Sequence, residues 1–375
     1  MMRKHLFIGA MSGTSMDGLD LALVEISEKK INTLASHSED LPPSLRDRLQ
    51  RLCTPSENEI EISGQADVEF ALLTAKAVNS LLEKNNLSPS DIQAIGSHGQ
   101  TIRHKPYAKF PFSLQIGNPS VIAHQTKITT IADFRMADIA AGGQGAPLVP
   151  AFHEAVFSSN LDARAIVNIG GIANISLLNP LTTATGYDMG PGNTLLDQWI
   201  QKNKSLPFDQ NGQWGESGAL LPELLSALKQ DTFIQKKPPK STGREYFNLC
   251  WLNTMLMKTY PENTSQVKPA DIQHTLTEFT AQSIADSIPR NTHTKPCDIF
   301  FCGGGVRNTF LMQRLKSLLP NHNIATTESL GVDPQLVEAS AFAWLASRTL
   351  AGLDGNIREV TGANAPKILG GIYPA

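Results

Sequence analysis

One order of predicted elements occurs twice along this chain: an apolar hairpin, a helix, a buried strand and a glycine-rich loop. Each hairpin has two apolar, β-branched runs around a tight turn, and each helix has apolar residues at helical spacing. The hairpin, helix and strand cover residues 6–26, 66–82 and 92–98 in the first copy and 165–178, 272–288 and 297–302 in the second. Such an order also arises by chance in α/β proteins. A true duplication predicts two related domains that face each other across one nucleotide.

The turn of the first hairpin, residues 12–18, has the composition of a phosphate-binding loop. Gly13 and Gly18 let backbone N–H groups approach an anion closely, and the hydroxyl groups add donors. Asp17 or Asp20 can hold a hydrated Mg²⁺. No Lys stands beside the glycines, which excludes the Walker pattern. The alternative is an ordinary hairpin with a polar turn.

Composition narrows the class of protein. The chain has 375 residues, which is longer than a single hydrophobic core usually supports. Two domains with a cleft between them are therefore expected. With 41% hydrophobic residues, 18% charged residues and a net charge of -3, it has no electrostatic feature that predicts binding to nucleic acid or to a membrane. A small molecule is the expected partner. Four scattered cysteines without a CxxC pair, and no segment of membrane-spanning length, favour a reducing cytoplasm.

Two further glycine loops follow predicted strands, where open α/β sheets bind ligands. In GYDMGPGN, residues 186–193, Asp188 ends a strand, and Asn193 or Thr194 is expected to cap a helix whose N-terminal N–H groups face a phosphate. In FFCGGGVRN, residues 300–308, three glycines let a flat adenine or ribose lie against the backbone. Neither loop matches GxGxxG, so a Rossmann dinucleotide site is not supported.

Six segments resemble, in order, those of the bacterial anhydro-N-acetylmuramic acid kinase family. They are GAMSGTSMDGLD, SHGQTIRH, ADFRMADIAAGGQGAPLVPAFH, VNIGGIANI, YDMGPGN and CGGGVRN, and the resemblance runs from residue 9 to about residue 370. It implies the α/β fold of actin, hexokinase and Hsp70, with two duplicated actin-like (ribonuclease H-like) domains and a nucleotide cleft between them. Residues 1–128 are expected to form the first domain and residues 129–349 the second, and residues from about 350 to 375 are candidates for packing back on the first.

The activity that this resemblance implies is that of an ATP-dependent kinase acting on a bridged amino sugar. Such an enzyme opens the 1,6-anhydro ring of anhydro-N-acetylmuramic acid with water and phosphorylates O6. The products are N-acetylmuramate 6-phosphate and ADP, in cell-wall recycling and amino-sugar catabolism. A general base must activate the water, and the resemblance assigns that role to Asp188. The alternative for Asp188 is a cap on the turn that follows it.

The resemblance also implies contacts for ATP, Mg²⁺ and the sugar. The expected ATP and phosphate contacts are Gly13, Thr14, Ser15, Met16, Asp17, Gly18, Leu19, Asp20, Gly170, Gly171, Asn174, Gly303, Gly304 and Gly305. Mg²⁺ is expected beside Asp17, through water. The expected sugar contacts are His98, Gln100, Thr101, Asp133, Arg135 and Asp138. Arg135 is the candidate partner of the lactyl carboxylate, with a structural ion pair as the alternative, and His98 is either a sugar ligand or a buried core histidine.

Two positions near these segments are expected to act less directly. Met189 stands where the family has Thr, so a candidate phosphate-binding hydroxyl is missing, and a changed nucleotide affinity is expected rather than a lost activity. Glu338 lies in a helix predicted over residues 334–350, whose apolar stripe indicates packing. Glu338 is therefore expected to be a buried cap or an ion-pair partner more than a ligand.

Two other functions are compatible with these patterns. A nucleotide-gated binding module on the same fold would hydrolyse ATP without acting on a sugar, and a conventional kinase would phosphorylate a free amino sugar. A zinc site is not supported, because no helical face would gather the ligands. The histidines considered are His98, His104, His124 and His153. The resemblance further implies a cytoplasmic homodimer with a small sugar substrate and with no nucleic-acid or membrane partner.

Overall fold

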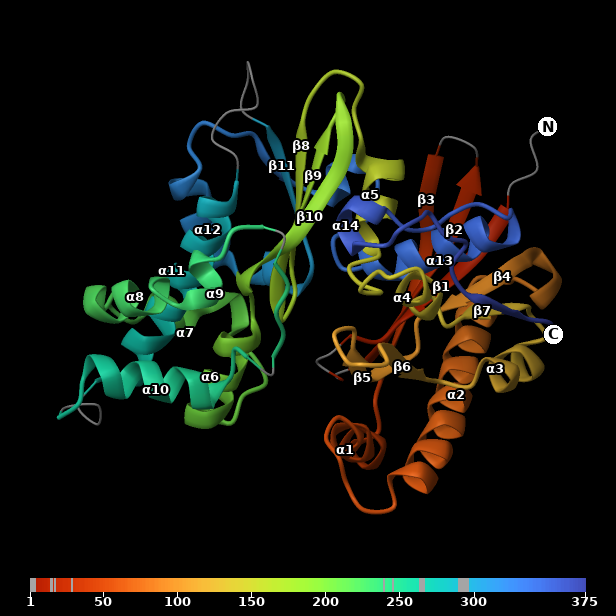
Figure 1. Cartoon of the computed structure of the whole chain (residues 1–375), viewed down its shortest axis with the longest axis horizontal. Coiled ribbons are helices and arrows are strands. Elements are labelled where there is room, and N and C mark those ends of the chain that lie inside the picture. The colour runs from red at the N-terminus through yellow and green to blue at the C-terminus, as the bar shows by residue number, and fades with distance from the viewer. Residues whose placement is uncertain are drawn as a thin grey trace. The chain divides into compact units, whose positions relative to one another are not determined.

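The computed structural model describes residues 5–13, 16, 18–27, 30–238, 240–244, 246–262, 267–288 and 297–375. The chain forms two compact units. Unit 1 comprises Met1–Phe157 and Gly331–Ala375, and unit 2 comprises Ser158–Leu330. Each unit has its own sheet (Figure 1). Each unit also has its own hydrophobic core.

Unit 1 is built on a mixed sheet. Its strands are β1 (His5–Met11), β2 (Gly18–Ser27), β3 (Lys30–Asp40), β4 (Ile92–Ser97), β5 (Gln100–Lys105), β6 (Phe112–Ile116), β7 (Thr130–Ala132) and β13 (Gly371–Tyr373). Its α-helices are α1 (Pro43–Leu52), α2 (Glu59–Lys84), α3 (Pro119–Thr126), α4 (Met136–Ala140), α5 (Val149–Phe157), α13 (Val337–Leu350) and α14 (Arg358–Thr361). The sheet has the order β13-β7-β4-β1-β2-β3, and β5 pairs with β6 in a separate hairpin.

Unit 2 has a second mixed sheet with a larger set of helices. Its strands are β8 (Arg164–Ile169), β9 (Ile172–Asn179), β10 (Thr182–Pro191), β11 (Asp298–Cys302) and β12 (Ile324–Thr326). Its α-helices are α6 (Thr194–Lys204), α7 (Gln213–Glu216), α8 (Pro222–Lys229), α9 (Thr232–Gln235), α10 (Leu249–Thr259), α11 (Pro269–Ser287) and α12 (Thr309–Leu318). The sheet has the order β10-β9-β8-β11-β12.

The two sheets share one topology. In each unit the first strand is central, and the second and third strands continue from it antiparallel. The fourth and fifth strands continue on its other side in parallel. The helices predicted at residues 66–82 and 272–288 correspond to α2 and α11. The expected α/β fold with two duplicated units is therefore confirmed.

The unit boundaries differ from the expected ones at residues 128/129 and 349/350. β7 follows the first expected boundary, yet it pairs with β4 in the sheet of unit 1. α13 precedes the second, yet it packs on β1 and β4. Strand partners and helix packing faces are tertiary contacts, so a local sequence pattern does not reveal them. The C-terminal segment does belong to unit 1, where β13 pairs with β7.

α13 lies very close to the sheet of unit 1 because two strand positions carry no side chain. A Cβ built on Gly9 would lie 1.7 Å from the carbonyl oxygen of Ala339, and one built on Gly96 would lie 2.0 Å from that of Phe342. Phe342 and Leu345 bring the apolar stripe of the helix into the core. α13 is therefore the packing element that its sequence predicts.

Replacing Gly9 with Ala is expected to lower the free energy of unfolding of unit 1 by about 1–3 kcal/mol, because the new methyl group overlaps helix backbone that cannot rotate away. Urea denaturation measures the change. The matched control is Gly64→Ala in α2, where a Cβ meets no atom within 4 Å and should stabilise the helix by about 0.5–1 kcal/mol. Equal effects at the two positions would contradict the proposed close packing.

His153 on α5 makes unit 1 sensitive to acid. Its ring packs against Phe152 and Phe157, and burial lowers its pKa to about 3. Below about pH 6.5 the unfolded chain binds a proton here that the folded chain does not, so this contribution to stability is present above pH 6.5 and is lost as the pH falls. Between pH 7 and pH 5 the loss is about 2 kcal/mol. In His153→Leu, the difference in the free energy of unfolding between pH 7 and pH 5 should be smaller than in the wild type by about 2 kcal/mol. Unfolding curves at the two pH values measure it. An unchanged difference would show that His153 is not the source of the acid sensitivity.

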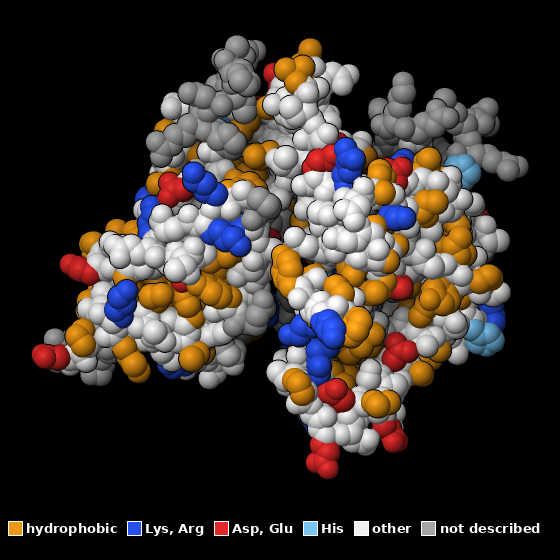
Figure 2. All heavy atoms as spheres, viewed as in Figure 1, with side chains coloured by type: hydrophobic (Ala, Val, Ile, Leu, Met, Phe, Trp, Pro, Cys, Tyr) orange, Lys and Arg blue, Asp and Glu red, His pale blue; other side chains and the backbone are white. Residues whose placement is uncertain are grey.

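Neither a membrane-spanning helix nor a disulfide occurs within the described residues. Within them, no helix combines the length and the apolar character that a membrane crossing requires. No disulfide joins Cys53, Cys250, Cys297 or Cys302, all of which lie in the described ranges. Figure 2 shows acidic and basic side chains scattered among uncharged ones on the visible face of each unit. This mixture fits the small net charge of the chain.

Candidate active site

Three polar residues form a row across the sheet of unit 2. Asn168 on β8 lies opposite Asn174 on β9, and Asn174 lies opposite Asp188 on β10. Directly opposed residues point to the same face of a sheet, so the three side chains share one face. The sequence predicted Asn174 and Asp188 but missed Asn168. The repeated Asn spacing in VNIGGIANI is the signal that could have identified it.

Asp188 is half-buried and is held by the segment that follows α9. Its Oδ2 accepts hydrogen bonds from Ser241 Oγ at 2.8 Å and from the backbone N–H of Thr242 at 2.9 Å. Burial lowers the pKa of Lys240 next to it, and the negative charge of Asp188 opposes that shift. This carboxylate is thus anchored by donors from outside its own turn, which is more than a simple turn cap requires.

Met189 points away from this polar row. A β-bulge separates Asp188 from Gly190 on β10, and the Met189 side chain is buried in the core of unit 2. A side chain at this position packs with apolar neighbours and does not lie beside Asp188. The expectation that Met189 removes a phosphate-binding hydroxyl is therefore not supported by its position.

The glycine turn between β8 and β9 is bound to the start of α6. The carbonyl oxygen of Gly170 accepts a hydrogen bond from Asn193 N, and that of Gly171 accepts from Gly192 N and Thr194 N, at 2.8–3.0 Å. Asn193 takes the N-cap position, but its side chain donates to the carbonyl of Ile169. The N–H groups of residues 193 and 194, which were expected to face a phosphate, therefore hold the turn instead.

Gly303, Gly304 and Gly305 follow β11 beside the same turn. A Cβ on Gly303 would meet Asn168 Oδ1 at 2.2 Å, and one on Gly305 would meet the Ile169 side chain at 2.2 Å. Gly304 is exposed, and its Cβ would have no neighbour closer than 3.6 Å. Two of these glycines are thus required for packing, and Gly304 presents open backbone.

Arg244 lies against Gly171 in the turn between β8 and β9, and no sequence motif predicted it as a site residue. A Cβ on Gly171 would lie 2.9 Å from Arg244 Nε and 3.0 Å from its Nη2. Arg244 ends the segment KSTGR, residues 240–244, whose Ser241 and Thr242 bind Asp188. A short run of basic, hydroxyl and glycine residues is the signal that could have pointed to it.

The predicted phosphate turn of unit 1 is only partly described. Met16 has a left-handed backbone with φ 56°, and its N–H donates to the carbonyl of Gly13. The side chains of Met16 and Leu19 are buried in the core, so only their backbone is available to a ligand. Asp20 is exposed and accepts a hydrogen bond from Ser38 Oγ at 2.6 Å. The predicted contacts Thr14, Ser15 and Asp17 lie outside the described residues.

Gln100 supports this turn from β5. The buried Ser12 Oγ lies 2.7 Å from Gln100 Oε1 and 2.9 Å from the carbonyl oxygen of Gly18. Gln100 is fully buried, so it holds the turn and does not present its amide at the surface. Thr101 remains half-buried, and its hydroxyl accepts a hydrogen bond from Gln115. The structure thus connects two motifs that the sequence predicted separately.

His98 and Arg135 bind each other. Arg135 donates to His98 Nε2 from Nη2 at 2.8 Å and from Nε at 3.2 Å, and it donates from Nη1 to the carbonyl of Gly145. Burial and the nearby guanidinium hold the pKa of His98 well below its ordinary value. The imidazole is neutral with its proton on Nδ1, because Nε2 accepts. His98 is therefore a buried partner of Arg135.

Asp138 is enclosed completely. Its Oδ1 accepts hydrogen bonds from Asn356 and Thr361, and its Oδ2 accepts one from the N–H of Gly145. With both oxygens bound and no exposed surface, Asp138 is not placed as a direct sugar contact. It joins the segment after α4 to the C-terminal residues. Asp133 is exposed as a residue, but its carboxyl group is partly buried, and this partial burial raises the pKa of that group.

Glu338, at the start of α13, is a third charged residue near Arg135 and Asp138 in unit 1. Burial and the negative charge of Asp20 raise its pKa, and the positive charge of Arg135 opposes the rise. Burial also lowers the pKa of Arg135 to about 10, with Glu338 and Asp138 opposing. Glu338 therefore lies within electrostatic range of Asp20 and Arg135, and its role as an ion-pair partner stays a prediction.

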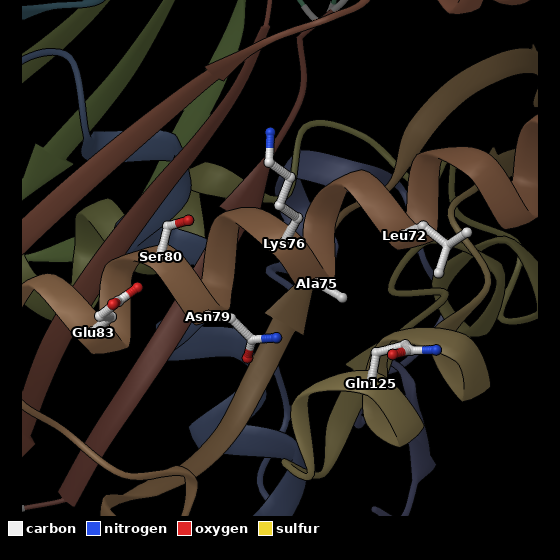
Figure 3. A pocket seen from close by; sticks show the side chains of 7 residues that line it. All are labelled: Leu72, Ala75, Lys76, Asn79, Ser80, Glu83 and Gln125. Atoms are coloured by element: carbon white, nitrogen blue, oxygen red, sulfur yellow. The ribbon is translucent and has the colours of Figure 1, made fainter.

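The surface of the described residues includes two open hollows. One of about 470 Å³ adjoins the anchor of Asp188 and is lined by Thr232, Phe233, Lys236, Ser241, Thr242 and Tyr246. The other, of about 360 Å³, lies over α2 and α3 and is lined by Leu72, Ala75, Lys76, Asn79, Ser80, Glu83 and Gln125 (Figure 3). No predicted site residue lines either hollow. The first lies beside Ser241 and Thr242, which bind Asp188.

The described residues contain no group of three His, Cys, Asp or Glu side chains that could hold a metal ion. An exposed single carboxylate such as Asp20 suits Mg²⁺, since that ion keeps several waters and is usually shared with phosphate.

Two duplicated α/β units with glycine turns at the ends of equivalent strands, and a held carboxylate beside one turn, are the arrangement of an actin-like kinase. The model of the family described as "Anhydro-N-acetylmuramic acid kinase" matches residues 5–375. The chain belongs to this family.

Relatives over the full length support this assignment. A protein named anhydro-N-acetylmuramic acid kinase from Saccharophagus degradans is 48% identical over 99% of this chain and 100% of its own length. Proteins with the same name from Coxiella burnetii and Actinobacillus pleuropneumoniae are 48% and 45% identical, over 99% and 100% of this chain and 98% and 100% of their own lengths. A solved ROK family glucokinase from Streptomyces griseus aligns over 92% of this chain and 99% of its own, with 13% identity and a TM-score of 0.40, which is too low to support a conclusion.

Proposed function

We propose that this chain is an ATP-dependent kinase that opens 1,6-anhydro-N-acetylmuramic acid with water and phosphorylates O6. The observation that carries the proposal is the position of Asp188, which is fixed by Ser241 and Thr242 beside the glycine turn of unit 2. An anchored carboxylate at a phosphate-binding turn suits a reaction in which proton removal and phosphoryl transfer occur together.

In the proposed reaction, Asp188 accepts a proton from a water molecule. The water oxygen forms a bond to C1 of the sugar, and the bond between C1 and O6 breaks. O6 takes the γ-phosphoryl group, the bond to the β-phosphate breaks, and ADP leaves. The proton on Asp188 is then released to solvent, which restores the base. The products are N-acetylmuramate 6-phosphate, ADP and one proton, so all atoms are accounted for.

The proposed contacts with ATP lie on the glycine turns. They are Gly13, Thr14, Ser15, Asp17, Gly18 and Asp20 with the backbone of Met16 and Leu19, and Gly170, Gly171, Asn174, Gly303, Gly304 and Gly305. Mg²⁺, held through water by Asp17 or Asp20, would neutralise phosphate charge.

The proposed sugar contacts are Thr101, Asp133 and Arg135, with His98, Gln100 and Asp138 positioning the elements that carry them. Arg135 remains the proposed partner of the lactyl carboxylate. Its anchors on His98 and Gly145 would orient the guanidinium and limit the side-chain freedom that is lost on binding. We further propose a cytoplasmic homodimer, which the family resemblance supports and which sedimentation analysis tests.

The deciding experiment measures ADP release with ATP and a panel of amino sugars in ¹⁸O-labelled water. We expect turnover with the 1,6-anhydro sugar and label on C1 of the phosphorylated product, and unlabelled product incubated in the same water corrects for exchange. Slow ATP hydrolysis that no sugar accelerates would indicate a nucleotide-gated binding module instead. Turnover of a free amino sugar without label at C1 would indicate a conventional sugar kinase.

A further inference from the structure

Phosphoryl transfer requires positive charge around the group being transferred. The residues proposed above as ATP contacts include no basic side chain, and the first hairpin has no Walker lysine. Mg²⁺ would neutralise only part of the triphosphate charge. A kinase of this kind therefore needs a further cation near the γ-phosphate.

Arg244 has a position that meets this need. Its guanidinium lies against Gly171, on the turn proposed to bind phosphate. The nearest atoms to a Cβ on Gly171 all belong to Arg244, at 2.9, 3.0 and 3.3 Å, and the glycine has no left-handed backbone. At Gly170, by contrast, a Cβ would meet nothing closer than 3.5 Å. The absence of a side chain at position 171 thus makes room for the guanidinium.

The segment that carries Arg244 is fixed on both sides. Upstream, Ser241 and Thr242 bind Asp188. Downstream, the carbonyl of Gly243 accepts a hydrogen bond from the N–H of Phe247, whose side chain is fully buried in the core. A segment held at both ends keeps its side chain in place at little entropic cost on binding.

One short segment therefore contacts both the proposed phosphate turn and the proposed base. The transferred phosphoryl group is the part of the nucleotide that must lie near both. We infer that the Arg244 guanidinium binds the γ-phosphate of ATP and neutralises its charge during transfer to the sugar. This inference rests on the proposed function, and it adds a catalytic residue that the family resemblance did not supply.

The first test compares nucleotide affinities without sugar. In Arg244→Gln, affinity for a non-hydrolysable ATP analogue measured by calorimetry should fall about 10- to 100-fold, as expected for loss of a charge-assisted contact, while ADP affinity changes little. The matched control is Arg164→Gln, at the opposite end of β8, where the guanidinium lies over Phe300. The control should leave both affinities unchanged. An equal loss for ADP and the ATP analogue, or no loss, would overturn the inference.

The second test concerns turnover. With the anhydro sugar and saturating ATP, kcat of Arg244→Gln should fall about 100- to 1000-fold, whereas Arg164→Gln should retain it. Added guanidinium ion should restore part of the activity of Arg244→Ala, which a purely structural role would not allow. Absence of rescue in folded protein would count against the inference. If the wild-type protein itself does not act on the anhydro sugar, the proposed function fails, but the affinity comparison still decides the role of Arg244.

Gly171→Ala provides a test that keeps the arginine. The new methyl group would lie only 2.9–3.0 Å from the Arg244 guanidinium nitrogens and would displace the guanidinium, without straining the backbone. We expect the same selective loss of affinity for the ATP analogue, with a thermal unfolding midpoint close to that of the wild type. Unchanged affinity in this variant would show that the contact between Arg244 and Gly171 does not matter for binding.

Discussion

Asp188→Asn is expected to lower kcat for phosphorylation of 1,6-anhydro-N-acetylmuramic acid by about 10²–10⁴-fold, the usual contribution of a general base. An amide cannot take the proton from water, but its oxygen can still accept the hydrogen bonds from Ser241 and Thr242. The anchoring of the segment 240–244 should therefore persist. Steady-state kinetics with the anhydro sugar measures the loss, and calorimetry should show nearly unchanged affinity for ADP.

Asp298→Asn is the matched control for this variant. Asp298 begins β11 in the same unit, and its carboxylate accepts a hydrogen bond from Asn323. Its replacement removes the same charge and should leave kcat unchanged. If Asp188→Asn retained wild-type kcat with the anhydro sugar, Asp188 would be a turn cap and the proposed mechanism would lose its base.

Asp138→Ala is expected to lower the free energy of unfolding of unit 1 by about 3–5 kcal/mol. The substitution removes a fully buried carboxylate and leaves three donors without their acceptor: Asn356, Thr361 and the N–H of Gly145. Because these donors belong to distant parts of unit 1, the loss loosens the C-terminal segment from the segment after α4. Urea denaturation measures the effect.

The control for Asp138 is Asp354→Ala. Asp354 is exposed and lies 3.7 Å from Arg348, so its loss should cost no more than about 1 kcal/mol. A direct role in sugar binding makes the opposite prediction for Asp138: KM for the sugar would rise while stability stayed near that of the wild type. That outcome would restore Asp138 to the set of sugar contacts.

Much of the fold follows from local sequence. Residues 165–178 form two apolar runs around Gly170 and Gly171, a pattern that predicts a hairpin. The spacing of apolar residues over 66–82 predicts a helix. The repeated order of elements also predicted the shared topology of the two sheets. The ends of the units were not predictable, because β7 and α13 join unit 1 through contacts with residues far away in the chain.

The same distinction between local sequence and tertiary contacts holds for the candidate site. By themselves, the sequence motifs predicted the duplicated α/β fold and the glycine turns, since turns and strand ends depend on residues a few positions apart. The family resemblance pointed to Asp188, whose role as the base stays a prediction. Only the tertiary structure decided that Asp138 is buried and bound on both oxygens, that Met189 faces the core and that Arg244 lies on Gly171. The physical reason is that burial, pairing and close approach depend on which distant segments meet. The residues next to Arg244 in the chain do not indicate that it packs against a glycine at position 171.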